Sequence, residues 1–171
     1  MQNYFELFDL ETSFLVDDEA LKKAYQTQVT RFHPDNFATK SQAEQLQALQ
    51  STSLLNSAYT ALKTPLNRAS YLLNLEDVDP FDEKDTNMDA NFLLSQIELR
   101  EQLEGIKEQQ DSLALDEFIE RVQDFIRDNV ASISEAFMQS KDLQEIKTLV
   151  RELKFYDQLN KEANILMDEW L

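Results

Sequence analysis

His33 is the only histidine of the chain, and it stands in the tripeptide His33-Pro34-Asp35 between two helical sequence patterns. Proline lacks a backbone N–H and disfavours the α conformation in the residue before it, so a helix that runs into Phe32 should end there. The tripeptide should then lie on an exposed connection, where polar side chains serve recognition more often than packing. An imidazole beside a carboxylate could move protons, as a catalytic pair does, or it could form a contact for another protein.

Catalysis by this pair would require a pocket and a further group that orients the base. The sequence contains no cysteine and no second histidine, and it has no glycine-rich phosphate loop or cluster of metal ligands. A structural zinc site is also disfavoured, because its ligands are mostly cysteine and histidine. We therefore predict that the chain is not an enzyme and holds no cofactor or metal. The alternative, a metal-dependent enzyme, would require the chain to bind a metal tightly.

The chain of 171 residues, 42% of them hydrophobic, has enough apolar material for one or two modest cores. No apolar run approaches the roughly 18 residues of a membrane span. The N-terminal segment MQNYFELFDL lacks the basic region and the cleavage site of a targeting signal. These features predict a globular, cytoplasmic protein that does not enter a membrane.

Negative charge is concentrated in the second half of the chain. Residues 1–75 carry 6 Lys and Arg against 8 Asp and Glu, a net charge of −2, whereas residues 76–171 carry 10 against 25, a net charge of −15. Proteins that bind nucleic acid or an anionic membrane need an excess of Lys and Arg to contact phosphates. The charge distribution therefore argues against nucleic-acid and membrane partners.

The first 75 residues predict four helices. A short helix of about two turns over residues 4–10 precedes an amphipathic helix that begins at an Asp17 or Asp18 cap and ends at Phe32. The polar face of this second helix offers Lys22, Lys23 and Arg31.

Ser41 and Glu44 fit a capping box, which predicts that a long helix begins near Ser41 and continues to Lys63. Thr64 and Pro65 provide the cap and first residue of a fourth helix. The expected apolar face of the long helix consists of Ala43, Leu46, Leu54, Ala58, Ala61 and Leu62. This helix can pair antiparallel with the one before the tripeptide.

In this order and spacing, the motifs of residues 4–75 resemble a J-domain, which implies a helical hairpin with flanking short helices. The residues that carry the resemblance are YFELF from Tyr4, Lys22-Lys23-Ala24-Tyr25, His33-Pro34-Asp35, Asn56-Ser57-Ala58-Tyr59-Thr60-Ala61-Leu62 and Pro65-Leu66-Asn67-Arg68-Ala69-Ser70-Tyr71. The resemblance implies that the chain binds an ATP-dependent chaperone of the DnaK class and stimulates its hydrolysis of ATP. The chaperone-binding residues that it implies are His33, Pro34, Asp35, Lys22, Lys23 and Arg31. Asn36 departs from the family, which commonly has lysine after the tripeptide.

Residues 76–88 (EDVDPFDEKDTNM) form a predicted boundary, because six acids and a proline disfavour helical continuation. Three amphipathic patterns follow, over about residues 89–110, 111–139 and 141–170. Helices of this kind should form an antiparallel three-helix bundle. The predicted fold is all-α, with a J-domain over residues 1–75, a linker over residues 76–88 and a three-helix domain over residues 89–171.

The helix predicted from residue 89 has two apolar faces. At about 100° per residue, its core stripe lies within roughly 60° of arc and consists of Phe92, Leu99, Leu103 and Ile106. A second apolar group falls to the side, among charged residues, and consists of Leu93, Leu94 and Ile97. This second group either forms a binding surface or packs against another part of the chain.

With this domain included, the whole chain resembles the HscB family of co-chaperones of iron–sulfur cluster assembly. The resemblance rests on the J-domain ending Tyr71-Leu72-Leu73 and on the segment FLLSQIELRE from Phe92 to Glu101. It implies two protein partners, a dedicated DnaK-class chaperone of the HscA type and an iron–sulfur cluster scaffold protein of the IscU type. The scaffold-binding residues that it implies are Leu93, Leu94, Ile97, Glu98, Arg100, Glu101 and Phe155.

Two positions and one alternative function stay open within this resemblance. Gly105 stands where an acidic residue is frequent in the family, which leaves the edge of the scaffold site undefined. Phe155 lies either in this site or in the core, because the apolar stripe of the last helix drifts along its length. The alternative function is that of a general J-domain co-chaperone whose acidic bundle binds an unrelated client.

Overall fold

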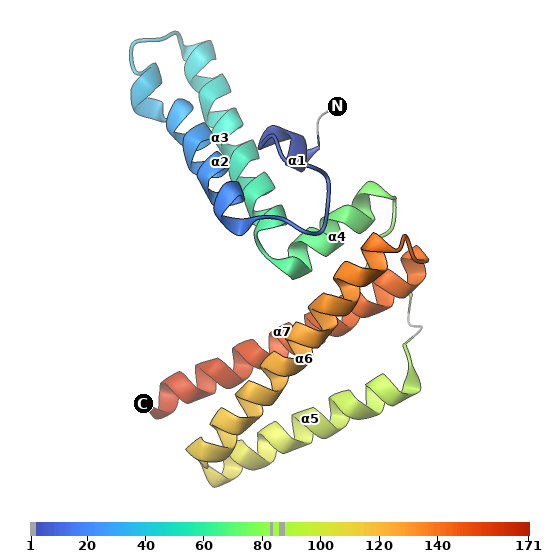
Figure 1. Cartoon of the computed structure of the whole chain (residues 1–171). Helices are drawn as coiled ribbons and strands as arrows, with labels where there is room; N and C mark the ends of the chain where they lie inside the picture. Colours follow the sequence, from blue (N-terminus) through green and yellow to red (C-terminus); the bar gives the residue numbers. More distant parts are fainter. Residues whose placement is uncertain (1–2, 83, 86–87) are drawn as a thin grey trace. The chain divides into compact units, whose positions relative to one another are not determined.

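The protein is built from helices in the part of the chain that the structure describes. The computed structural model describes residues 3–82, 84–85 and 88–171, which contain seven α-helices and one short 3-10 helix, without a β-strand. The helices fall into two compact units, Met1–Leu75 and Glu76–Leu171 (Figure 1). The predicted all-α fold is confirmed.

The N-terminal unit is built around a helical hairpin. Helix α2 (Asp18–Arg31) packs antiparallel to helix α3 (Gln42–Lys63), and both α1 (Tyr4–Leu7) and α4 (Pro65–Leu75) contact α3. The long helix α3 therefore forms the centre of this unit, and the connection between α2 and α3 forms one end of the hairpin.

Capping side chains set where these helices begin. The Asp17 carboxylate accepts hydrogen bonds from two backbone N–H groups in the first turn of α2. The Ser41 hydroxyl accepts one from Glu44 at 3.2 Å, and the Thr64 hydroxyl accepts one from Asn67 at 3.2 Å. Such caps satisfy amides that have no partner within the helix. The helix starts predicted at Ser41 and Thr64 are confirmed, and of the two caps predicted for α2, Asp17 or Asp18, the structure has Asp17.

Two details predicted for these helices are wrong. Helix α1 ends at Leu7 instead of Leu10, because Asp9 adopts a left-handed conformation with φ 55° that helical geometry does not allow. Leu46 and Leu54 of α3 are exposed. The buried residues of α3 are Ala48, Leu55, Ala58 and Leu62, so the predicted face is confirmed at Ala58 and Leu62. The predicted face combined residues from two sides of the helix.

Tyrosine side chains join the helices of the N-terminal unit. The rings of Tyr25 and Tyr59 stack with centroids 4.2 Å apart, and the Tyr25 hydroxyl donates to Asn56 at 2.5 Å. The rings of Tyr4 and Tyr71 stack at 4.7 Å, and the Tyr71 hydroxyl accepts a hydrogen bond from the Tyr4 N–H. The first pair holds the hairpin together, and the second holds α1 against α4.

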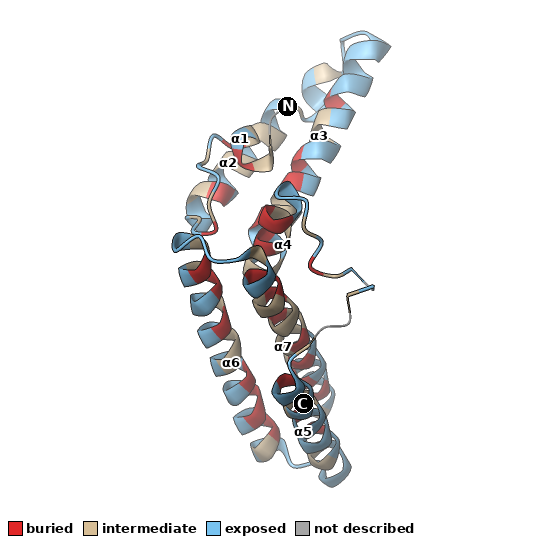
Figure 2. Ribbon diagram, turned by 90° about the vertical axis from the view of Figure 1, so that its right-hand side faces the viewer, coloured by how far each residue is buried: buried red, intermediate tan, exposed pale blue. Residues whose placement is uncertain are grey.

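The C-terminal unit is a three-helix bundle. Helices α5 (Ala90–Gln109), α6 (Ser112–Met138) and α7 (Leu143–Trp170) contact one another, and α6 runs antiparallel to the other two. Buried residues follow one side of α6 and of α7, with exposed residues opposite (Figure 2). The core includes Phe92, Leu99, Leu103, Leu115, Phe118, Val122, Leu159 and Ala163. The predicted antiparallel bundle is confirmed.

Part of the segment predicted as a linker packs on α7. Pro80 is fully buried, and the Lys154 ammonium lies 4.2 Å from the centroid of the Phe81 ring. The Asp85 carboxylate pairs with the Lys147 ammonium at 2.5 Å. These contacts attach the described part of the segment to the bundle. The residues of the predicted linker that lie outside the described ones are Glu83, Thr86 and Asn87.

Candidate functional site

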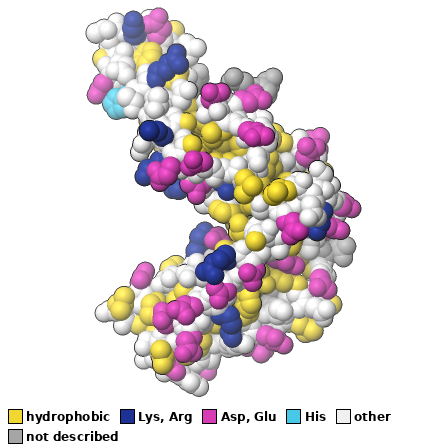
Figure 3. Space-filling view, viewed as in Figure 1, with side chains coloured by type: hydrophobic (Ala, Val, Ile, Leu, Met, Phe, Trp, Pro, Cys, Tyr) yellow, Lys and Arg dark blue, Asp and Glu magenta, His cyan; other side chains and the backbone are white. Residues whose placement is uncertain are grey.

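The His33-Pro34-Asp35 tripeptide lies on the connection between α2 and α3. Helix α2 ends at Arg31, and Pro34 then begins the 3-10 helix η1 (Pro34–Phe37). The side chains of His33 and Asp35 are 53% and 92% exposed, and the histidine appears in cyan at the surface in Figure 3. The tripeptide is therefore accessible to a partner protein.

The position of the His33 ring determines which atom it offers to a partner. Its Nδ1 accepts a hydrogen bond from the Asp35 backbone N–H at 3.2 Å. A ring nitrogen that accepts is unprotonated, so the neutral imidazole carries its proton on Nε2. Asp35 Oδ2 lies 3.6 Å from Nδ1, a contact that becomes an ion pair only when the ring is protonated. With neutral His33, the tripeptide offers an N–H donor and a carboxylate acceptor.

Side-chain hydrogen bonds hold this connection in place. The Asn36 amide donates to the Thr30 carbonyl of α2 at 2.8 Å. From α3, the Gln45 amide donates at 3.1 to 3.3 Å to the carbonyls of Phe37, Ala38 and Lys40. No local sequence pattern marks either role, because both depend on backbone groups placed by the tertiary fold. Asn36, which departs from the family pattern, anchors the connection to α2.

The three cations implied for chaperone binding do not share one face of α2. Lys22 and Lys23 are exposed near the start of the helix, whereas Arg31 is exposed in its last turn. At about 100° per residue, Lys22 and Arg31 lie on opposite sides of the helix, with Lys23 between them. Only Arg31 adjoins the tripeptide, since about 15 Å of helix separates the lysines from Phe32 at 1.5 Å per residue.

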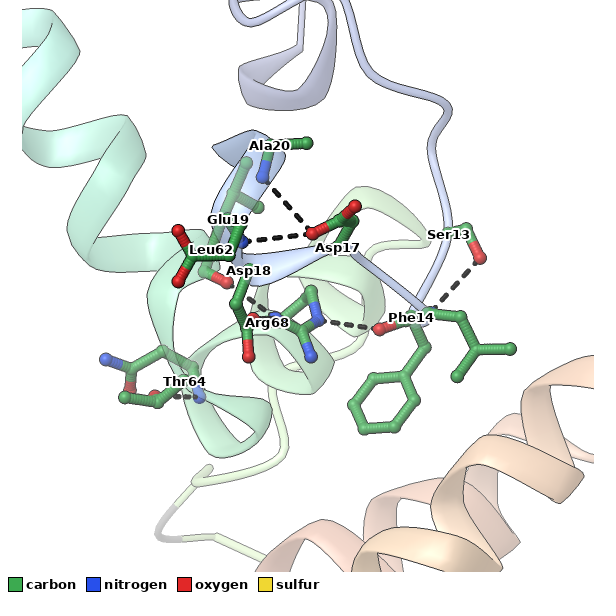
Figure 4. A network of polar contacts seen from close by, with 11 residues as sticks. Ser13, Phe14, Asp17, Asp18, Glu19, Ala20, Leu62, Thr64 and Arg68 are labelled. Carbon is green, nitrogen blue, oxygen red and sulfur yellow. Dashed lines mark hydrogen bonds and ion pairs between the residues drawn. The ribbon is translucent and has the colours of Figure 1, made fainter. Parts of the chain in front are cut away.

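Arg68 is a buried cation that joins three segments of the N-terminal unit (Figure 4). Its Nε donates to the Phe14 carbonyl at 2.6 Å, and its Nη1 donates to the Leu62 carbonyl at 2.8 Å. Nη1 also lies 3.9 Å from the Asp18 carboxylate in the first turn of α2. Burial lowers the pKa of Arg68, and the Asp18 charge partly opposes that shift. These contacts fix the start of α2 to α4 and the end of α3.

We expect Arg68→Met to lower the free energy of unfolding by about 2–4 kcal/mol, because the buried carbonyls of Phe14 and Leu62 would lose their donors. Urea unfolding followed by circular dichroism would measure the change. Arg127→Met, at an exposed arginine of α6, is the matched control. An equal loss in both variants would mean that the Arg68 hydrogen bonds contribute little.

Helix α5 carries a second exposed site. Leu93, Leu94 and Ile97 are 42%, 59% and 55% exposed, and we call these three residues the α5 patch. The buried residues of the same helix are Phe92, Leu99 and Leu103. The predicted division of this helix into a core stripe and a separate apolar group is confirmed. Adjacent exposed apolar side chains of this size favour a binding surface.

Charged side chains surround the α5 patch. Glu98, Arg100 and Glu101 are all exposed on α5. The Arg100 guanidinium pairs with the Glu162 carboxylate at 2.9 Å and lies 5.4 Å from the centroid of the Phe155 ring. Acidic side chains are spread over the face of the C-terminal unit seen in Figure 3. The patch is thus an apolar area with a charged rim, as in many protein–protein interfaces.

The structure locates the two positions that the sequence left open. Phe155 is 8% exposed and packs edge-on against Phe92 with centroids 5.8 Å apart, so its ring is part of the core. The Arg100 guanidinium lies over this ring. Direct contact of Phe155 with a scaffold stays a prediction. A side-chain atom added at Gly105 would meet nothing within 4 Å. The edge of the site at Gly105 is therefore open.

Burial of the Glu152 carboxylate on α7 raises its pKa above 4.5, and the nearby charge of Asp89 raises this pKa further. The folded state therefore holds this proton more tightly than the unfolded state, and stability is lost as pH rises above the ordinary pKa and through the raised one. We expect Glu152→Gln to raise the melting temperature at pH 8, and the gain to shrink at pH 5.5. A gain independent of pH would contradict this account.

The described residues were compared with what a metal site and a membrane-spanning helix require. Among the described residues, no group of three or more His, Cys, Asp or Glu could hold a metal ion. None of the described helices combines the length and the apolar character that crossing a membrane requires.

An exposed His-Pro-Asp connection on a helical hairpin, followed by a bundle with an exposed apolar patch, defines a J-domain co-chaperone. Residues 3–71 match the family described as DnaJ domain, and residues 88–164 match the HSCB C-terminal oligomerisation domain. Together with the full-length relatives below, these matches show that the chain belongs to the HscB family of co-chaperones.

The relatives match the chain along its length. A co-chaperone protein HscB homolog of Aliivibrio salmonicida is 39% identical, with 99% of both chains covered. That of Photobacterium profundum is 38% identical, with 96% of both covered. The chaperone HscB structure from Vibrio cholerae is 37% identical, with a TM-score of 0.89 over 99% of this chain and 100% of that one. The family expected from the sequence is confirmed.

Proposed function

We propose that the chain is a two-site adaptor of iron–sulfur cluster assembly in the cytoplasm. Its J-domain stimulates the ATPase of a dedicated DnaK-class chaperone of the HscA type, and its bundle delivers a scaffold protein of the IscU type to that chaperone. The observation that carries the proposal is that each unit has its own exposed site, the tripeptide on one and the α5 patch on the other.

The chaperone site acts by contact and leaves the chemistry to its partner. His33 and Asp35 offer a donor and an acceptor on a connection that Asn36 and Gln45 hold in place. A ligand shifts a conformational equilibrium only by as much as it binds one state better than another. The J-domain would therefore bind best to the state of the chaperone from which ATP is hydrolysed. Pro34 and Arg31 adjoin this contact, and Lys22 and Lys23 would meet the chaperone near the start of α2.

The scaffold site combines an apolar centre with a charged rim. Leu93, Leu94 and Ile97 would lose exposed apolar surface on binding, which favours association. The proposed rim consists of Glu98, Arg100 and Glu101, with Phe155 as support beneath Arg100. Charges at a rim contribute more to orientation and partner choice than to affinity.

Carrying both sites on one chain raises the concentration of scaffold near the chaperone. A second binding event within a linked complex takes place at an effective concentration set by the link. The scaffold would then meet the chaperone as the J-domain promotes hydrolysis. Chaperone activation and client delivery would thereby be coupled in time.

A second candidate keeps the J-domain and gives the bundle another role. The matched C-terminal family is described as an oligomerisation domain, and an exposed apolar patch also suits contact between copies or with an unrelated client. Titration calorimetry against a purified IscU-type scaffold, alongside sedimentation of the chain alone, separates these candidates. Binding to scaffold by a monomer supports the adaptor.

The experiment that tests the proposed function measures ATP turnover by an HscA-type chaperone. The chain alone should increase turnover, and the chain with scaffold should increase it further than either one does separately. A general DnaK-class chaperone from the same source serves as the comparison. Equal stimulation of both chaperones, without an effect of scaffold, would contradict a dedicated adaptor.

A further inference from the structure

A hollow of about 520 Å³ lies beside the α5 patch. Its lining residues come from α5, from α7 and from the described part of the segment before α5. Leu93 belongs both to the patch and to the wall of this hollow, and the ring of Phe155 also lines it. A partner segment that covers the patch can therefore reach into the hollow.

Basic side chains gather in this hollow on a strongly acidic unit. Arg100, Arg151 and Lys154 line it, together with the carboxylates of Asp82 and Asp85. Residues 76–171 as a whole carry 10 Lys and Arg against 25 Asp and Glu. Most of the unit repels an approaching anion, whereas the cations of the hollow attract one. Such a local reversal of charge selects for an acidic ligand.

Two cations of the hollow, Arg151 and Lys154, are only weakly paired by contacts within the chain. The buried Nη1 of Arg151 has no hydrogen-bond acceptor among the described residues, and the nearest Asp85 oxygen in its ion pair is 3.8 Å away. The Lys154 ammonium lies over the Phe81 ring, which attracts a cation less strongly than a close carboxylate does. A carboxylate in the hollow would give Lys154 an anionic partner, and the buried Nη1 of Arg151 would act on that carboxylate through its charge alone.

We propose that the hollow binds an Asp or Glu side chain of the scaffold protein, while apolar residues of the same scaffold segment cover the α5 patch. This inference rests on the scaffold-binding function proposed above and adds the chemistry of the partner. The apolar contact supplies most of the affinity. The carboxylate, held by Lys154 with Arg100 and Arg151 nearby, fixes the orientation of the scaffold and excludes partners without an acidic residue at that place.

Calorimetric titration of purified scaffold into the full-length chain tests the proposal. We expect Lys154→Glu to weaken binding by about tenfold or more, because it places a carboxylate against a carboxylate. Lys154→Met keeps the side-chain stem, so it should weaken binding less and reduce the dependence of affinity on salt. Lys161→Glu makes the same charge change at an exposed site of α7 and should alter affinity less than about twofold.

A further variant separates charge from the packing of the segment before α5. Phe81→Leu removes the ring under Lys154 but keeps the cation, so it should bind scaffold nearly as well as the unchanged chain. An equal loss in Phe81→Leu and Lys154→Glu would overturn the proposal, since the cause would be packing. Equal affinities of Lys154→Glu and Lys161→Glu would also overturn it.

The α5-patch variant Leu93→Ala, Leu94→Ala, Ile97→Ala, measured alongside, distinguishes the two levels of the account. If the patch variant loses affinity and Lys154→Glu does not, the carboxylate site is wrong and the scaffold-binding function stands. If both keep full affinity, the proposed scaffold site itself is wrong.

Discussion

His33→Gln should reduce stimulation of the chaperone ATPase by at least about tenfold, which corresponds to about 1.4 kcal/mol of lost preference for the hydrolysing state. In the structure, Nδ1 is satisfied by the Asp35 N–H while the ring remains half exposed. A flexible glutamine would not hold its donor and acceptor in this fixed arrangement. Steady-state ATP turnover at saturating co-chaperone measures the loss.

Scaffold affinity supplies the internal control for His33→Gln. Because the tripeptide and the α5 patch lie in different units, calorimetric affinity for scaffold should stay within about twofold, as expected for sites built from separate sets of residues. Thr39→Ala, at an exposed residue near the end of the same connection, should keep full stimulation. Full stimulation by His33→Gln would show that the tripeptide is not part of the chaperone site.

The combined change Leu93→Ala, Leu94→Ala and Ile97→Ala should weaken scaffold binding by roughly 100-fold or more. Truncation of large apolar residues at the centre of an interface costs about 1–2 kcal/mol each when they are well buried by the partner. The variant should fold normally, because these three side chains are largely exposed in the free chain. Titration calorimetry measures the affinity, and thermal unfolding checks the fold.

A matched control for this variant uses exposed apolar residues elsewhere on the bundle. Leu113→Ala with Met138→Ala removes comparable exposed surface from α6 and should leave scaffold affinity unchanged. ATPase stimulation by the patch variant, measured without scaffold, should equal that of the unchanged chain. Retained scaffold affinity in the patch variant would show that the scaffold binds another surface.

The sequence predicted both proposed sites where local rules decide the outcome. Pro34 ends α2 whatever the rest of the chain does, so exposure of His33 and Asp35 followed from the tripeptide itself. Helical periodicity similarly separated Leu93 and Ile97 from the core stripe, because both faces lie within one continuous helix. Family resemblance then supplied the expected partners, which periodicity does not reveal.

Contacts between residues that are far apart in the sequence were not predicted, because no local pattern marks them. Arg68 and Phe14 are 54 positions apart, and nothing local marks the arginine as buried. The attachment of Phe81 to Lys154 likewise joins the predicted linker to α7 through the tertiary fold. On α3, alternating alanines and leucines occupy more than one side, so the core face containing Leu55 could not be chosen from pattern alone.

Bridging of chaperone and scaffold by one molecule is the central claim, and a mixing measurement tests it most directly. ATP turnover by the HscA-type chaperone with scaffold would be compared between the unchanged chain and an equimolar mixture of His33→Gln with the α5-patch variant. The mixture contains both intact sites on separate molecules. Scaffold should act synergistically with the unchanged chain, and it should show no synergy with the mixture. Equal synergy from the mixture would contradict the adaptor.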